Sequence, residues 1–191
     1  HHWGNDWNKG FKIYSELDEL ISEQKNFEFT YIGNLPENFK FKNSNYLKPL
    51  SGLDLSEELK SHHLYLTASL NEPSGNHHIE AAQCGLPLMF INSGGIVEYC
   101  IDYGLMFEEY NFHEKLLYMV ENYDKYFDKV QNYSLSSEST NKQFLDLFYK
   151  LTKEKTKKTI NFENFRIQLF QIVLFYYKVL KFIYIKINAK T

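Results

Sequence analysis

Hydrophobic and polar positions over residues 1–130 predict helices and strands in alternation. Apolar side chains at helical spacing predict a helix over 11–21, and a β-prone run predicts a strand over 27–32, stopped by Gly33 and Pro36. By the same criteria, strands are expected over 46–47, 64–67, 88–91 and 105–107, and helices from residue 56, from about residue 76, over 96–100 and over 113–130. In the last of these helices, the side chains expected to face inward are Leu116, Leu117, Val120 and Tyr123. This alternation is typical of an α/β fold with a parallel, doubly wound sheet.

The stretch from Leu64 to Pro87 combines a strand, a polar loop and a short helix, followed by another strand. Such a βαβ unit leaves a ligand crevice at the carboxyl end of its first strand. Glu72 and Glu80 frame the loop, and the free N–H groups at the helix start suit a phosphate. Glu80 lies about one turn further, roughly 5.4 Å, where a ribose diol attached to that phosphate can sit. Taken alone, Glu80 is more often an exposed glutamate that stabilises its own helix start, so residue types leave both roles open.

The segment from Glu72 to Pro87, EPSGNHHIEAAQCGLP, resembles the E-x7-E segment of family-4 glycosyltransferases, EPxGxxxxEAxxCGxP. The likeness continues in residues 92–98, NSGGIVE, which are similar to that family's GG-x-x-E segment, and in Lys9-Gly10-Phe11, similar to its KG-phi element. These elements follow one another in the family's order over roughly the first 110 residues. The resemblance implies the Rossmann-like, C-terminal half of a GT-B fold, the half that binds the nucleotide-sugar donor.

The resemblance also implies roles for individual residues. Glu80 is expected to bind the ribose hydroxyls of a nucleotide-diphosphate sugar, because a carboxylate can accept two hydrogen bonds from a vicinal diol. Glu72 is the expected catalytic residue, which contacts the donor sugar and stabilises positive charge that develops at its anomeric carbon. Lys9 is expected to neutralise the diphosphate as a point charge. The remaining expected donor contacts are the backbone N–H groups of Gly75, Asn76 and His77, and the glycine pair Gly94 and Gly95.

The chain departs from the family pattern at one basic position. The family usually places an arginine a few residues before the lysine, whereas the only arginine here is Arg166. His2 lies in that region and can donate a hydrogen bond, but it offers no bidentate fork. The adjacent pairs His62-His63 and His77-His78 cannot ligate one metal from one helix face, so we expect no metal site. The implied enzyme needs no cofactor, because the nucleotide sugar is its substrate.

The function that the resemblance implies is transfer of a sugar, with retention of configuration, from a nucleotide-sugar donor to a sugar or lipid-linked acceptor in glycan biosynthesis. The chain opens in a loop that should follow a strand, so we expect the first strand of this domain, and an acceptor domain, to lie ahead of His1. Two other functions stay open at this point: a non-catalytic nucleotide-sugar-binding module, and a sugar-phosphate epimerase of the same architecture.

Charge, cysteine spacing and composition predict the cellular compartment and the domain boundaries. A net charge of −3 argues against binding to nucleic acid, and Cys84 and Cys100 follow no disulfide or metal spacing, which favours a reduced, cytoplasmic location. We expect the donor-binding domain over 1–150 and a basic linker with an amphipathic, aromatic-rich helical tail over 151–191. The tail either packs onto the domain expected ahead of His1 or lies peripherally at the inner face of the membrane.

Overall fold

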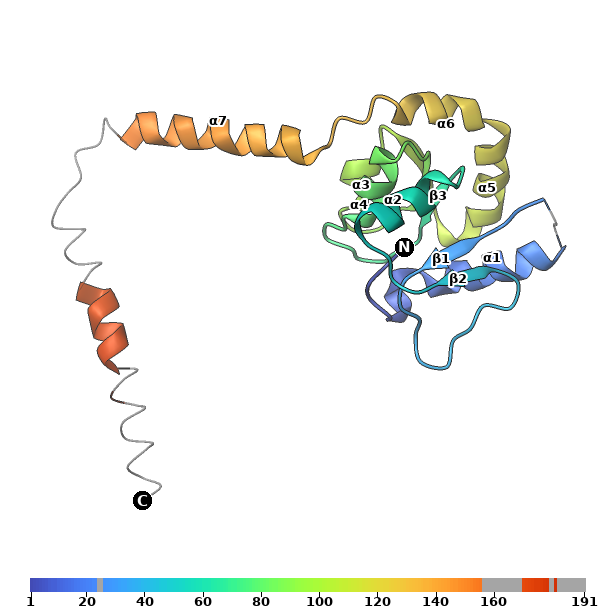
Figure 1. Cartoon of the computed structure of the whole chain (residues 1–191), viewed down its shortest axis with the longest axis horizontal. Coiled ribbons are helices and arrows are strands. Elements are labelled where there is room, and N and C mark those ends of the chain that lie inside the picture. Colours follow the sequence, from blue (N-terminus) through green and yellow to red (C-terminus); the bar gives the residue numbers. More distant parts are fainter. Residues whose placement is uncertain (24–25, 156–169, 179–180, 182–191) are drawn as a thin grey trace, which may run out of the picture. The chain divides into compact units, whose positions relative to one another are not determined.

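The computed structural model describes residues 1–23, 26–155, 170–178 and 181 (Figure 1). The chain divides into two units, residues 1–139 and 140–191, whereas the composition changes after Tyr149. Helix α7, Ser137–Lys155, crosses both positions, so the first residues of the expected basic linker are helical. Most of the tail expected over 162–187 lies outside the described residues.

Among the described residues of the first unit, five short strands form two parallel sheets. One sheet pairs β1, Thr30–Ile32, with β2, Asn45–Leu47. The other contains β3, Tyr65–Thr67, β4, Leu88–Ile91, and β5, Gly104–Phe107, with β4 in the centre. All pairs are parallel, as expected for a doubly wound α/β fold.

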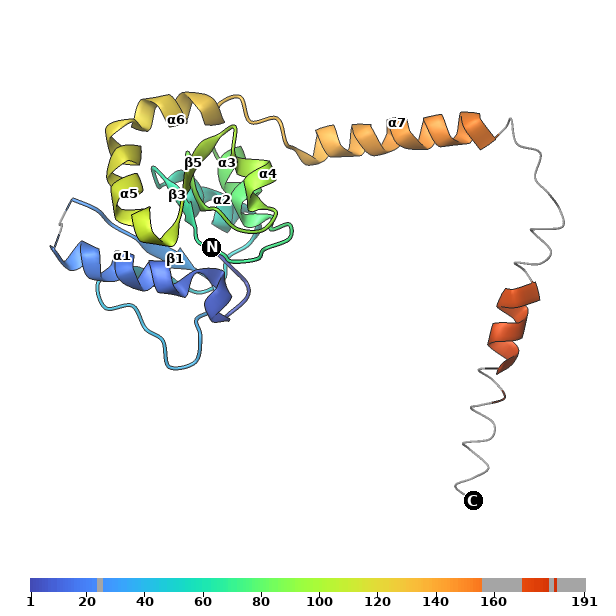
Figure 2. The ribbon, with the colours of Figure 1, turned by 180° about the vertical axis from the view of Figure 1, so that it is seen from behind.

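Helices cover both faces of these sheets. In chain order they are η1 (Trp7–Lys9), α1 (Phe11–Glu23), α2 (Gly52–Lys60), α3 (His77–Gln83), α4 (Ile96–Cys100), η2 (Glu109–Asn111), α5 (Phe112–Glu121) and α6 (Tyr123–Val130). Two hydrophobic clusters fill the space between the helices and the sheets. One contains residues of α1 and α5, and the other contains residues of α2, α3 and α4. Helix α1 lies over β1 in the view of Figure 2. Strand β4 contributes Met89 and Ile91 to the first cluster and Leu88 and Phe90 to the second, as a strand buried on both faces must.

The long helix expected over 113–130 is wrong, because the chain breaks at Asn122 into α5 and α6. The backbone N–H and the side-chain amide of Asn122 both donate to the carbonyl of Tyr118, which closes α5 and redirects the chain. The inward face differs as a result: Leu117 and Val120 are 39% and 46% exposed, while Met119 is buried.

Two element boundaries also differ from the expectation. Helix α2 begins at Gly52, directly after an extended Ser51, and not at Ser56. The strand expected over 27–32 is regular only from Thr30, where β2 provides its partner residues. In the part of the chain that the structure describes, no helix has the length and apolar character needed to cross a membrane.

Candidate functional site

A cavity of roughly 260 Å³ lies at the carboxyl end of β3, where the loop before α3 meets the segment around η1. Its lining residues are His1, His2, Trp3, Gly4, Lys9, Glu72, Gly75, Asn76, His77 and Glu80. The structure therefore brings together in one cavity all the predicted site residues except Gly94 and Gly95. The position agrees with the crevice expected at the end of the first strand of a βαβ unit.

Gly10 explains how Lys9 reaches this cavity. Its φ of 99° is in the left-handed region, and a Cβ at this position would lie 2.7 Å from the Cβ of Ala68. Only glycine tolerates both conditions. The neighbouring Asn8 carbonyl accepts the N–H of Leu70 at 2.6 Å, which fixes η1 against the loop after β3.

Lys9 and Glu72 form an ion pair at the cavity wall. The Nζ of Lys9 lies 2.6 Å from Oε2 of Glu72, and the Ser69 hydroxyl donates to the same oxygen at 3.3 Å. The two charged side chains are 24% and 14% exposed, so solvent screens this pair less than an ordinary surface pair. Lys9, which is expected to bind the diphosphate, and Glu72, the expected catalytic carboxylate, thus hold one another in place.

Gly94 and Gly95 lie against the backbone of the loop that carries Glu72, and they are not among the lining residues of the cavity. The N–H of Gly95 donates to the carbonyl of Glu72 at 2.8 Å, and a Cβ on Gly95 would lie 2.1 Å from the carbonyl oxygen of Pro73. At Gly94, φ is 62° and a Cβ would lie 2.5 Å from the Glu72 oxygen. The glycine pair therefore allows two backbones to touch and positions Glu72; a direct contact with a donor stays a prediction.

Glu80 lies in the first turn of α3 and lines the same cavity as the ion pair. Its backbone N–H donates to the Asn76 carbonyl at 2.9 Å, which begins the helix at the expected place. Its carboxylate lies 2.8 Å from Nε2 of His1, and the side chain is 48% exposed. Glu80 is therefore accessible to a diol, with one oxygen engaged by His1.

Four histidines gather at the cavity, and burial lowers the pKa of each. Three of them, His1, His2 and His77, line it, and the ring of His78 packs against that of His77. The pKa of His2 falls to about 3, through burial first and then the nearby charges of His1 and Lys9. The pKa of His78 falls to about 4 through burial, which Glu72 partly opposes. Burial lowers the pKa of His77 well below its usual range, and that of His1 is lowered for the same reason. These rings are neutral at pH 7 and bring no positive charge to the cavity.

Hydrogen bonds satisfy only some of the histidine nitrogens. The ring of His77 places Nδ1 at 3.2 Å from the Tyr65 hydroxyl, and His2 places Nε2 at 3.0 Å from the Tyr14 hydroxyl. Within the described residues, Nε2 of His77 and both ring nitrogens of His78 are buried without a partner. Leaving such groups unpaired costs stability. Because burial also lowers the pKa of these rings, the stability of the fold should fall as the pH falls.

The charged side chains that line the cavity are one lysine and two glutamates, so the side chains together carry a negative charge while the histidines are neutral. An anionic ligand must therefore displace Glu72 from Lys9 or rely on backbone N–H groups. Among the described residues, no group of three or more histidine, cysteine or carboxylate side chains is arranged to hold a metal ion.

His1, Trp3 and Gly4 also line the cavity, although the sequence did not single them out, and His2 was considered only as a stand-in for an arginine. The sequence feature that could have identified them is their position on the loop that leads into Lys9. Trp3 is 64% exposed, so its ring lies open at the rim.

Comparison with known proteins identifies a family. The sequence model of the family described as glycosyl transferases group 1 matches residues 6–134. Among 27 matching chains of solved structures is the crystal structure of TarM, with a TM-score of 0.55 and 19% sequence identity. The match covers 77% of this chain and 34% of TarM, so the chain spans about a third of that protein. At this identity the likeness shows the fold alone. A search of curated proteins finds no match.

Proposed function

The chain belongs to the group 1 glycosyl transferases, and from this premise we propose that its first unit is the donor-binding half of a GT-B enzyme. The proposed reaction is transfer of a sugar from a nucleotide-diphosphate sugar to an acceptor with retention of configuration. The observation that carries the proposal is the single cavity lined by Lys9, Glu72 and Glu80. Lys9 is far in sequence from the two glutamates, and Glu72 lies in the loop before the helix that carries Glu80. Each of the three residues has the chemistry that one part of such a donor requires.

Glu80 receives the ribose in this proposal. Its carboxylate is half exposed at the start of α3 and can accept hydrogen bonds from both hydroxyls of a vicinal diol. The ribose displaces the contact with His1. Gly75 and Asn76 end the loop ahead of Glu80, and His77 begins α3; all three offer backbone N–H groups to the diphosphate or the sugar.

Lys9 receives the diphosphate, and Glu72 faces the sugar. When the diphosphate enters, its charge competes with Glu72 for the Lys9 ammonium, which is now 2.6 Å from the carboxylate. The released carboxylate then lies where it can stabilise positive charge at the anomeric carbon. Lys9 stabilises the leaving nucleoside diphosphate, and the Gly94-Gly95 contact keeps the Glu72 backbone in place.

The acceptor is a sugar or a lipid-linked sugar, bound by a part of the enzyme outside the first unit. We further propose a cytoplasmic enzyme that associates peripherally with the membrane through residues 152–191. Helix α7 leads into this segment, and just ahead of it the apolar side chains Phe144, Leu147, Phe148 and Leu151 recur at helical spacing and are 47–60% exposed. An apolar stripe next to a lysine-rich sequence is suited to an anionic bilayer surface.

The experiment that tests the proposed function is a saturation-transfer NMR screen of nucleotide-diphosphate sugars that differ in base and sugar. We expect the ribose protons of at least one nucleotide sugar to receive saturation from the protein. The free sugar should give no signal. Binding of no nucleotide sugar would overturn the proposal. Binding without turnover, in an enzyme that includes an acceptor domain, would favour a non-catalytic binding module.

A further inference from the structure

The two carboxylate oxygens of Glu72 differ in their surroundings. Oε2 accepts a hydrogen bond from the Lys9 ammonium at 2.6 Å and another from the Ser69 hydroxyl at 3.3 Å. Within the described part of the chain no hydrogen bond reaches Oε1, and this oxygen is not fully buried. Since Glu72 also lines the site cavity, one of its oxygens is anchored to the protein and the other is left for a ligand.

Ser69 is a buried hydrogen-bond donor. It lies two residues after the end of β3 and is 0% exposed. Its hydroxyl bonds to Glu72 and, among the described residues, to no other group. Because a buried hydroxyl costs stability when it loses its partner, this contact constrains both side chains.

Hydrogen bonds of the backbone fix the turn that follows β3. The N–H of Leu70 donates to the Asn8 carbonyl at 2.6 Å, and the N–H of Asn71 donates to the Ser93 hydroxyl at 2.9 Å. Asn71 has a φ of 54°, a left-handed conformation that asparagine tolerates and that reverses the chain ahead of Glu72. The backbone therefore sets the distance between the hydroxyl donor and the carboxylate, and the Lys9 side chain is not needed for it.

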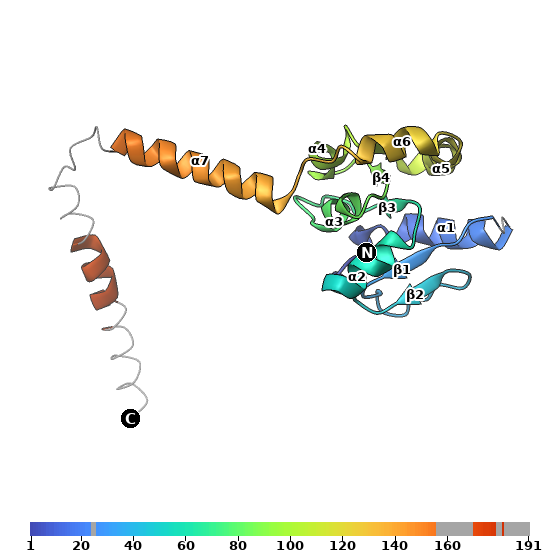
Figure 3. The same ribbon diagram turned by 45° about the horizontal axis from the view of Figure 1, so that its top comes forward.

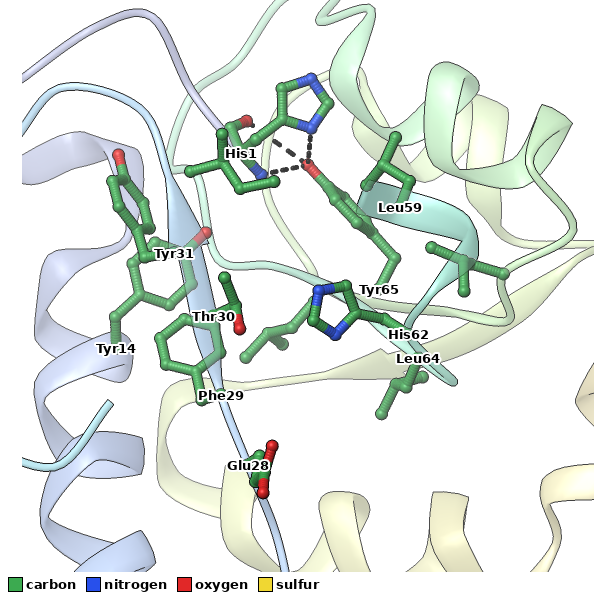
Figure 4. Close-up of a pocket in the computed structure, with 13 residues that line it drawn as sticks. His1, Tyr14, Glu28, Phe29, Thr30, Tyr31, Leu59, His62, Leu64 and Tyr65 are labelled. Atoms are coloured by element: carbon green, nitrogen blue, oxygen red, sulfur yellow. Dashed lines mark hydrogen bonds between the residues drawn. The ribbon is translucent and has the colours of Figure 1, made fainter. Parts of the chain in front are cut away.

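The segment that leads into Lys9 is held to β3 as well. In Figures 1 and 3 the chain begins beside β3 and α3. Nδ1 of His1 lies 3.3 Å from the hydroxyl of Tyr65, which belongs to β3 (Figure 4). The backbone of the segment is thus fixed, whereas the Lys9 ammonium stands at the end of a flexible four-carbon stem and can follow an anion.

A bound diphosphate should act differently on the two contacts of Oε2. It attracts the Lys9 ammonium, because opposite charges attract, but the buried, neutral Ser69 hydroxyl cannot move to it. Once Lys9 has left, the diphosphate repels the Glu72 carboxylate. A glutamate without any remaining partner would then rotate about its side-chain torsions and lose its direction toward the cavity.

We propose that Ser69 is a positioning residue, which keeps Oε2 of Glu72 in place after the diphosphate has taken Lys9, so that Oε1 stays directed at the donor sugar. In this position Oε1 can accept a hydrogen bond from a sugar hydroxyl and face the positive charge that develops at the anomeric carbon. The inference rests on the proposed function, and it adds which oxygen of Glu72 meets the sugar and which residue holds the other.

The test compares the calorimetric affinities of two ligands: a nucleotide-diphosphate sugar that binds the wild type, and the nucleoside diphosphate with the same base. Ser69→Ala should weaken binding of the nucleotide sugar by about tenfold and that of the nucleoside diphosphate by less than about twofold, because only the sugar meets Glu72. The matched control is Ser74→Ala. Ser74 belongs to the loop that carries Glu72, but its hydroxyl pairs with that of Tyr99 at 3.2 Å, so both ligands should bind this variant like the wild type.

A double-mutant cycle tests whether Ser69 acts through the carboxylate. In a Glu72→Ala background, Ser69→Ala should change the affinity of neither ligand. A further loss in that background, or an equal loss of both ligands in Ser69→Ala alone, would overturn the positioning role. If Ser69→Ala does not fold, Ser69→Cys takes its place, because a thiol fills the same space and is only a weak donor; the same selective loss is expected.

The failure of this inference can be told apart from the failure of the proposed function. A wild type that binds nucleotide sugars, together with a Ser69→Ala variant that binds them equally well, would overturn the role of Ser69 alone. A wild type that binds no nucleotide sugar would overturn the proposed function, and this inference with it.

Discussion

Replacement of His78 by leucine should make the fold less sensitive to acid. The His78 ring is fully buried, both of its nitrogens lack hydrogen-bond partners within the described residues, and burial holds its pKa at about 4. In the unfolded chain the ring takes up a proton near its ordinary pKa of 6.5. Between these values only the unfolded state is protonated, so the stability of the wild type falls as the pH falls from 6.5 toward 4.

The magnitude follows from this window. Each pH unit within it costs about 1.4 kcal/mol for one group, so the change from pH 7 to pH 5 costs about 2 kcal/mol through His78. This is a large fraction of a total stability of about 5–15 kcal/mol. Leucine has a similar volume and no unpaired nitrogen, so at pH 7 the variant should be as stable as the wild type or more stable.

Urea unfolding at pH 7 and pH 5, followed by tryptophan fluorescence, measures this difference. Both tryptophans, Trp3 and Trp7, are in the first unit, so the signal reports the fold that contains His78. The matched control is His113→Leu, since His113 is exposed on α5. The His78→Leu variant should lose about 2 kcal/mol less than the wild type between the two pH values. An identical loss of stability in the wild type and in His78→Leu would refute the reasoning that His78 is a neutral, buried ring.

Three further predictions concern the ion pair, the glycine pair and the tail. Lys9→Ala should weaken binding of a nucleoside diphosphate by about 1–3 kcal/mol and leave the bare nucleoside unaffected; calorimetry that finds equal losses for both would show that Lys9 only supports the loop. Gly95→Ala should destabilise the first unit by about 1–3 kcal/mol, because its Cβ would overlap the Pro73 carbonyl while its φ of −78° is one that alanine adopts readily; unchanged urea midpoints for Gly95→Ala would contradict the close contact. The chain should float with anionic liposomes and lose flotation when residues 152–191 are removed; flotation of neither form on any lipid composition would favour packing of the tail onto another domain.

The order of strands and helices could be predicted from the sequence because each element carries its own periodicity. The run from β3 to β4 was predicted in full, since Gly85 and Pro87 punctuate it and β4 is apolar throughout. The break at Asn122 could not be predicted in the same way. It depends on one amide side chain that bonds back to Tyr118, and the apolar spacing continues across it.

The meeting of the candidate residues in one cavity was predictable where they come from one local segment, and less so where distant backbones meet. Glu72 and Glu80 belong to a continuous stretch, whereas the approach of Lys9 depends on contact between Gly10 and Ala68. The supporting role of Gly94 and Gly95 depends in the same way on contact with Glu72 and Pro73. The burial of the histidines could not be predicted either, because adjacent polar side chains, such as those of His77 and His78 at the start of α3, usually face solvent.

The most direct test of the account is calorimetric titration of the best-binding nucleotide-diphosphate sugar into the wild type, Glu80→Gln and Glu57→Gln. Glu57 is an exposed glutamate on α2 and serves as the matched control. Glu80→Gln should weaken binding by about 1–3 kcal/mol, the range for a hydrogen bond to a charged group, while Glu57→Gln should bind like the wild type. Equal affinities for all three proteins would contradict the assignment of Glu80 to the ribose, and with it the placement of the donor in this cavity.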